Sequence, residues 1–256
     1  MSRLLSATAL AAALPLAAQA NEVSPEIIFG SGNADGGFTI KTVSTAVGGI
    51  EIALRAKLRF DDQSSCSAFG GAFTNIGCPQ NTFNYDGTDS YAFSLANGNP
   101  PPGYAMWNYE WSVSLLDGGT IAELVDDGAR ADLAYDIDPG AGTTFQTYSV
   151  TDFDAWYGDL ATGNGDGAYD KTGTPVAGAT VAQNSVNYGF ILGAPLGAGT
   201  YDIELRLYNV HGDFIGDTAI TVNVAPIPVP AALPLGALAL GGLGLYARRQ
   251  RMARDG

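Results

Sequence analysis

The sequence predicts an all-β protein, an antiparallel β-sandwich, and two observations support this fold class. Apolar and polar residues alternate along several segments, and clusters of Gly, Asn, Asp and Pro separate those segments. No segment keeps a helical spacing of apolar residues over several turns, although 152–160 could form one short turn. The segment 21–225 contains neither an internal repeat nor a linker, so we expect one β-sandwich ectodomain there.

The segment 50–60 has the clearest strand pattern. Its even positions are all apolar, whereas its odd positions include the charged residues Glu51, Arg55, Lys57 and Arg59. Side chains alternate between the two faces of a strand, so this pattern predicts a half-buried strand whose charged face meets solvent.

Four further strands follow from the same alternation. We expect 107–115 and 133–137 to lie within the sandwich, together with 91–95 and 186–192. The side chains predicted to face the core are Tyr91, Phe93 and Leu95; Trp107, Tyr109, Trp111, Val113 and Leu115; Leu133, Tyr135 and Ile137; and Val186, Tyr188, Phe190 and Leu192.

The last hairpin is predicted from alternation over 201–207 and 220–224, on either side of the polar turn 209–216. Its opening, Gly199-Thr200-Tyr201, resembles the start of the final hairpin in immunoglobulin-like and PKD-like surface domains. That resemblance implies a tyrosine corner at Tyr201 and a C-terminus on an edge strand. The stretches 29–33, 137–140 and 182–185 are similar to uncharacterised β-sandwich ectodomains, to which no activity is attached.

The N-terminal segment 1–20 has the pattern of a secretory signal peptide. Arg3 supplies the positive charge, Leu4 to Ala17 supplies the apolar stretch, and Ala18 and Ala20 form a small-x-small cleavage site. We therefore expect an exported protein whose mature chain begins at Asn21. An N-terminal membrane anchor is the less favoured interpretation, because the apolar run is short.

The C-terminal segment 226–256 has three parts: a Pro-rich hinge, a short apolar helix over 231–247, and an Arg-rich end that is expected to stay cytoplasmic. Within it, the apolar run from Ala231 to Tyr246 has 16 residues, which is marginal for crossing a bilayer, since that takes about 20. From these parts alone, the tail could be a weak permanent anchor. The motif residues are Ile227, Pro228, Val229, Pro230, Ala231, Arg248, Arg249 and Arg251.

This three-part tail resembles the VPLPA variant of the PEP-CTERM sorting signal, which bacterial exosortases process. Ile227 and Val229 stand where Val and Leu are usual, with size and polarity kept. The resemblance implies export by the secretion machinery and a transmembrane intermediate in the inner membrane. It further implies cleavage near Pro230 by an exosortase-type enzyme and delivery to the cell surface or outside. Cargo of this kind is often linked to exopolysaccharide or the biofilm matrix.

Once both terminal segments are removed, the chain is strongly acidic. Five of the 12 basic residues lie in these segments, but only one of the 26 acidic residues, which leaves 25 acidic and 7 basic side chains. The resulting net charge of −18 excludes binding to nucleic acid or anionic lipid. Cys66 and Cys78 are expected to form a disulfide, because the exported protein meets an oxidising compartment.

The loop 162–170 resembles half of a calcium-binding loop of the EF-hand type. Asn164, Asp166 and Asp170 fit three of its ligand positions, whereas Thr162 and Gly173 replace two charged ligands. The sequence therefore predicts at most a weak structural calcium ion. Asp159 could complete the site, and a plain turn explains Asn-Gly-Asp-Gly equally well.

The sequence offers no catalytic constellation. His211 is the single histidine, in the tip of the final hairpin, and no Gly-x-Ser-x-Gly elbow occurs. Glu110 lies between Trp107 and Trp111, where burial would raise a carboxyl pKa as a glycosidase requires, but outward placement by simple alternation explains it as well.

Two functions therefore stay open. The first is a non-catalytic surface or matrix protein associated with exopolysaccharide. The second is a secreted carbohydrate-active module, either a sugar-binding domain or a weak glycoside hydrolase, with Trp107, Trp111 and Trp156 as sugar platforms. Tryptophan exposure discriminates between them, because platforms must be accessible to a sugar and core residues are not.

Overall fold

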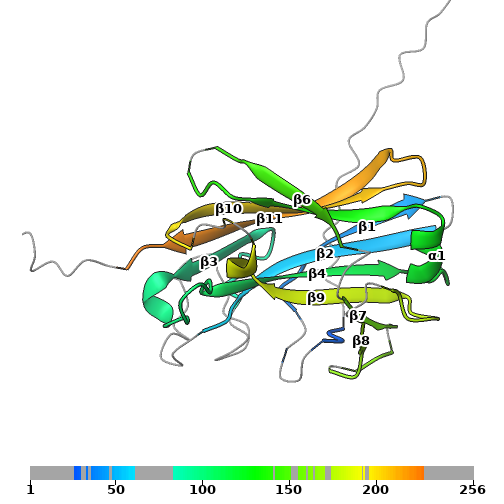
Figure 1. Ribbon diagram of the computed structural model, residues 1–256, viewed down its shortest axis with the longest axis horizontal. Helices are drawn as coiled ribbons and strands as arrows, with labels where there is room; N and C mark the ends of the chain where they lie inside the picture. Colours follow the sequence, from blue (N-terminus) through cyan, green and yellow to red (C-terminus); the bar gives the residue numbers. More distant parts are fainter. Residues whose placement is uncertain are drawn as a thin grey trace, which may run out of the picture.

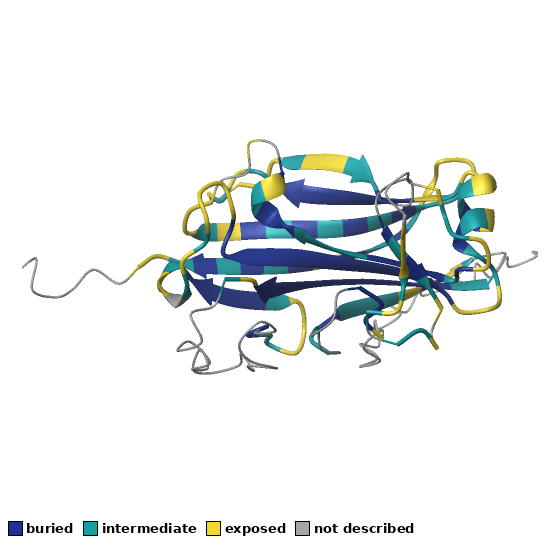
Figure 2. Cartoon of the chain, turned by 60° about the horizontal axis from the view of Figure 1, so that its bottom comes forward, coloured by how far each residue is buried: buried dark blue, intermediate teal, exposed yellow. Residues whose placement is uncertain are grey.

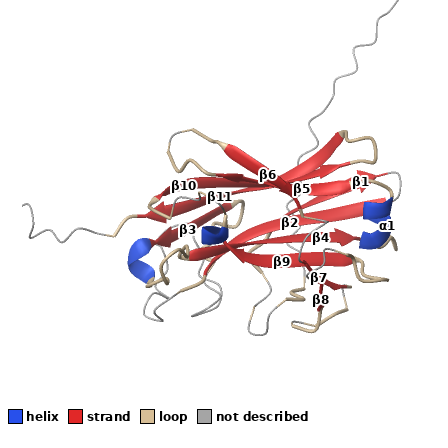
Figure 3. Cartoon of the chain, in the orientation of Figure 1, coloured by secondary structure: helices blue, strands red, loops and turns tan. Residues whose placement is uncertain are grey.

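Two β-sheets pack face to face, which confirms the prediction of an all-β sandwich (Figure 1). The computed structural model describes residues 26–227, with the exception of 30–32, 34–35, 46–47, 61–82, 141, 151–154, 160, 164, 171–173, 192 and 194–195. Strands dominate this part of the chain, and the helical segments are short (Figure 3).

The larger sheet is entirely antiparallel. Its order is β1-β2-β4-β9-β7-β8, so β9 joins the middle of the sheet to the short β7–β8 pair. The bounds of its strands are β1 Thr39–Thr45, β2 Gly48–Leu58, β4 Trp107–Leu115, β9 Val181–Asn187, β7 Ala155–Gly158 and β8 Ala168–Asp170.

The smaller sheet has the order β3-β11-β10-β5-β6, and all its pairs are antiparallel except β11 with β3. Its strands are β3 Ser90–Ser94, β11 Phe214–Ala225, β10 Gly199–Tyr208, β5 Arg130–Asp136 and β6 Phe145–Ser149. Three short helical segments complete the described part of the chain: η1 Leu95–Asn97, α1 Ile121–Asp126 and η2 Tyr188–Phe190.

The main core lies between the two sheets. Alternate residues of β10 and β11 enter it, which leaves the intervening residues partly exposed on the outer face of the smaller sheet. Figure 2 shows the difference between the sheets: the central strands β2 and β4 are almost uniformly buried, whereas β10 and β11 alternate. Both faces of the larger sheet are therefore covered at β2 and β4.

The prediction of a solvent-exposed face on 50–60 is therefore wrong. Arg55 is fully buried, Lys57 is 4 % exposed, and Glu51 is also buried; only Arg59, beyond the end of β2, is exposed. The physical reason is a segment from the N-terminal side of the domain, residues 26–29, 33 and 36–38, which we call the strap. It packs over the outer face of the larger sheet and forms a second small apolar cluster there.

Two local predictions are also wrong. The segment 186–192 is a strand only up to Asn187, because the Asn187 side chain accepts a hydrogen bond from Gly189 N and begins the η2 turn. Part of 152–160 is the strand β7 rather than a helical turn.

Sequence alternation did not indicate the helix α1. A capping box between Thr120 and Glu123 stabilises the start of this helix.

The final hairpin is present, but β11 is not an edge strand. It lies between β10 and β3, which adds to the sheet in parallel beyond it. Tyr201 Oη donates a hydrogen bond to Gly197 O over 2.7 Å, the type of contact that a tyrosine corner makes. The last strand ends at Ala225, directly before the Pro-rich hinge.

Several predictions lie outside the described residues. These are the signal peptide with Ala18 and Ala20, the Cys66–Cys78 disulfide, and the tail from Pro228 onward. Ile227 is described and is exposed. Within the described ranges, no helix has both the length and the apolar character to cross a membrane.

Candidate functional site

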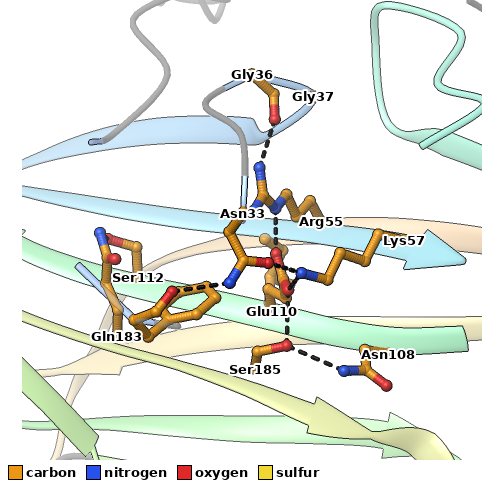
Figure 4. Close-up of polar contacts among 12 residues, drawn as sticks. Asn33, Gly36, Gly37, Arg55, Lys57, Asn108, Glu110, Ser112, Gln183 and Ser185 are labelled. Atoms are coloured by element: carbon orange, nitrogen blue, oxygen red, sulfur yellow. Dashed lines mark hydrogen bonds and ion pairs between the residues drawn. The ribbon is translucent and has the colours of Figure 1, made fainter. Parts of the chain in front are cut away.

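The charged residues that the sequence placed in solvent form a buried cluster across three strands. Arg55 on β2 is in register with Glu110 on β4, and Glu110 is in register with Ser185 on β9. All three side chains point to the outer face of the larger sheet, beneath the strap (Figure 4). The carboxylate of Glu110 therefore lies between the Ser185 hydroxyl on one side and the cations Arg55 and Lys57 of β2 on the other.

Glu110 is fully buried and is bound on several sides. Its carboxylate accepts from Arg55 Nε, from Lys57 Nζ at 2.6 Å and from Ser185 Oγ at 2.6 Å. Burial alone would raise its pKa, but the two cations and the hydrogen bonds outweigh burial, so the pKa lies below its ordinary value. Burial lowers the pKa of Lys57, although the charge of Glu110 acts in the opposite direction.

The strap seals this cluster from water. Arg55 Nη1 donates to Gly36 O over 2.7 Å, and the Arg55 guanidinium lies between the rings of Phe38 and Phe83, at 4.2 and 4.5 Å from their centroids. Lys57 Nζ donates to Asn33 Oδ1. Gln183 fixes the other end of the strap, since it accepts from Ile28 N at 3.0 Å and donates to Glu26 O at 2.9 Å.

This geometry is that of a structural ion-pair cluster. A general acid needs a raised pKa and access to a substrate, and Glu110 has a lowered pKa and is fully buried. Trp107 and Trp111 occupy the opposite face of β4, as simple alternation predicts, so the alternative in which aromatic neighbours raise the pKa of Glu110 is wrong.

The tryptophans are placed differently from sugar platforms. Trp107 is 2 % exposed and Trp111 is 1 % exposed, so both belong to the core, and their assignment as platforms is wrong. Trp107 stacks on Tyr188 with ring centroids 4.4 Å apart. Trp156 is partly buried against the strap cluster and lies 4.9 Å from the ring of Tyr169.

A groove of about 370 Å³ lies along β9. Figure 1 shows that β9 has β7 and β8 next to one end, and η2 follows its other end along the chain. The residues that line the groove are four aromatic residues, two polar residues and one aliphatic residue: Trp111, Tyr148, Tyr169, Phe190, Asn184, Ser185 and Val186.

Two of the lining aromatic residues are accessible. Tyr169 on β8 is 38 % exposed, and Phe190 on η2 is 62 % exposed. The prediction that Phe190 faces the core is wrong, because the η2 turn carries its ring outward. Sequence reasoning missed this groove, because alternation continues past Asn187, where the strand in fact ends.

The calcium loop is only partly described. Asn164 and the side chain of Asp170 lie outside the described residues, and Asp166 is exposed. Asp159 Oδ1 accepts from Ala161 N and Thr162 Oγ1 within its own turn. In the part of the chain that the structure covers, no group of three His, Cys, Asp or Glu residues could hold a metal ion.

His211 lies in the tip of the final hairpin and is exposed there. Its backbone N–H donates to Asn209 Oδ1 over 2.9 Å, so the turn depends on the asparagine rather than on the histidine. No protein-family model matches the chain, and no curated protein matches it.

Proposed function

We propose that this chain is a non-catalytic exported protein of the cell surface or extracellular matrix. An exosortase-type sorting signal at its C-terminus delivers it, by way of an inner-membrane intermediate. At the cell surface or in the matrix, the protein associates with exopolysaccharide or biofilm. The processing enzyme and the secretion machinery are its implied partners.

The single observation that carries this proposal is the three-part tail. A Pro-rich hinge, a short apolar run and an Arg-rich end follow one another in 226–256. The last strand ends at Ala225, so the hinge begins with the next residue and cleavage near Pro230 would leave the domain intact. The signal peptide at the other end supports export independently.

The fold supports a role in presentation rather than catalysis. The larger sheet is covered on both faces at β2 and β4, and its central carboxylate is held in an ion-pair cluster. We also propose that the sandwich is of the immunoglobulin-like or PKD-like type, on the contact of Tyr201 with Gly197.

A second candidate is a secreted carbohydrate-binding module, and the aromatic groove along β9 favours it. The two candidates are compatible, because a matrix protein needs a surface that holds polysaccharide. They differ in whether the tail or the groove determines where the protein stays.

Replacing the basic end of the tail tests the delivery proposal. In the producing cells, the variant with Arg248, Arg249 and Arg251 changed to Gln should accumulate unprocessed, whereas the native chain should reach the surface or the medium in shortened form. Arg59→Gln is the matched control, since Arg59 is an exposed arginine of the folded domain. Equal sorting of the tail variant and the native chain would refute the proposal.

A further inference from the structure

The groove along β9 has the chemistry of a site for an uncharged, hydroxyl-rich ligand. The accessible rings of Tyr169 and Phe190 offer apolar faces, Asn184 offers an amide side chain, and none of the seven lining residues is ionised at neutral pH. Ser185 lies beside Asn184 on β9, but its hydroxyl belongs to the buried cluster, where it donates to Glu110 and accepts from Asn108 Nδ2 at 3.0 Å.

An aromatic ridge extends this groove beyond η2. The ring of Phe190 lies 5.0 Å from that of Tyr104, and Tyr104 lies 5.6 Å from Phe60, both in edge-on contact. Tyr104 is 37 % exposed. A groove that continues into a row of rings suits an extended chain of several units better than one small molecule.

The platform at Phe190 is held in place before any ligand arrives. Asn187 accepts from Gly189 N and from Ala105 N, at 3.0 and 2.8 Å, and donates to Ala105 O at 3.0 Å. These bonds tie η2 to the loop that carries Tyr104. At the other end of the groove, Tyr169 is supported by Trp156. Preorganised rings lose little conformational entropy when a ligand binds.

We propose that this groove and its ridge bind a neutral polysaccharide. Sugar rings present C–H faces that pack on aromatic rings, and their hydroxyl groups match the amide of Asn184 in the lining. The net charge of −18 on the exported part repels anionic polymers, so a neutral chain is the favoured occupant. The inference rests on the proposed matrix function and names the surface through which that function acts.

Affinity electrophoresis of the protein purified from producing cells tests the proposal. The probes are a galactomannan, a mixed-linkage β-glucan and a dextran, with alginate as an anionic polymer. At least one neutral probe should retard the native protein, and alginate should not. Phe190→Ala and Tyr169→Ala should each weaken that binding about tenfold, since each removes one aromatic contact.

Phe214→Ala is the matched control, because Phe214 is 56 % exposed but belongs to β11 of the other sheet. It should bind like the native protein, and near-ultraviolet circular dichroism should show all three variants folded. The proposal is overturned if no neutral probe retards the protein, if alginate retards it equally, or if Phe190→Ala binds normally. A change of oligomeric size in Phe190→Ala would also overturn it, in favour of an interface between two copies of the chain.

This result is separable from the delivery proposal. A processed tail together with no polysaccharide binding would leave delivery in place and remove the groove inference. Polysaccharide binding together with an unprocessed tail would do the reverse.

Discussion

Removal of the buried carboxylate should strongly destabilise the fold. In Glu110→Ala, Arg55 and Lys57 lose their shared anion while the strap still excludes water from them. Breaking a buried ion pair by removing one partner costs about 3–5 kcal/mol, a large part of the roughly 5–15 kcal/mol that stabilises a typical domain. Glu110→Gln should be nearly as damaging, because the negative charge is lost there too.

Urea unfolding at neutral pH measures this effect as a fall in the midpoint at constant slope. The control is Asp217→Ala, which breaks the pair of Lys41 and Asp217, whose side chains are 43 % and 37 % exposed. That variant should lose less than about 1 kcal/mol. A loss in Glu110→Ala no greater than in the control would refute the description of the cluster.

A third variant separates the charge effect from the packing effect. Replacing all three charged residues with apolar ones, as in Arg55→Met, Lys57→Met and Glu110→Leu together, removes the uncompensated cations. Apolar replacement of a whole buried cluster is often neutral or stabilising. We expect this variant to recover most of the stability that Glu110→Ala loses, apart from the contacts of Arg55 with Gly36, Phe38 and Phe83.

Three further predictions follow from single side chains. Tyr201→Phe removes the 2.7 Å hydrogen bond to Gly197 O and should cost about 0.5–1.5 kcal/mol in urea unfolding, and no loss would argue against a tyrosine corner. Burial raises the pKa of Tyr148 to about 12. Because this folded value exceeds the unfolded value of about 10, the stabilising contribution of Tyr148 should be complete below pH 10 and lost as the pH rises toward 12. Tyr148→Phe should therefore show a smaller loss of stability than the native chain between pH 9 and pH 11. Acrylamide should quench little of the fluorescence of Trp107 and Trp111, which are buried, and Trp156→Phe should remove most of the fluorescence that acrylamide can quench. Strong quenching that persists in Trp156→Phe would contradict the burial of Trp107 and Trp111.

Alternation predicted strands well wherever one face meets the core and the other meets solvent. The segments 201–207 and 220–224 are the clearest examples, because their outward residues stay partly exposed. The same reasoning failed at 50–60, since the strap that buries Arg55 comes from an earlier segment of the chain. No local pattern in 50–60 indicates that a distant segment will cover its charged face.

The groove could not be predicted for a similar reason. It depends on β8, β9 and η2 lying together, and this follows from the non-sequential strand order β9-β7-β8. The outward turn of Phe190 depends on one side chain, Asn187, which ends the strand that alternation would have continued. By contrast, the Thr120–Glu123 capping box is a local signal from which α1 could have been predicted.

The C-terminus of the native protein is the most direct test of the central claim, that the tail is a processed sorting signal. Mass spectrometry of protein from the producing cells locates the last residue. We expect a chain that ends near Pro230 and lies outside the membrane. Peptides through Arg254 in membrane-bound protein would contradict it, and would identify the tail as a permanent anchor.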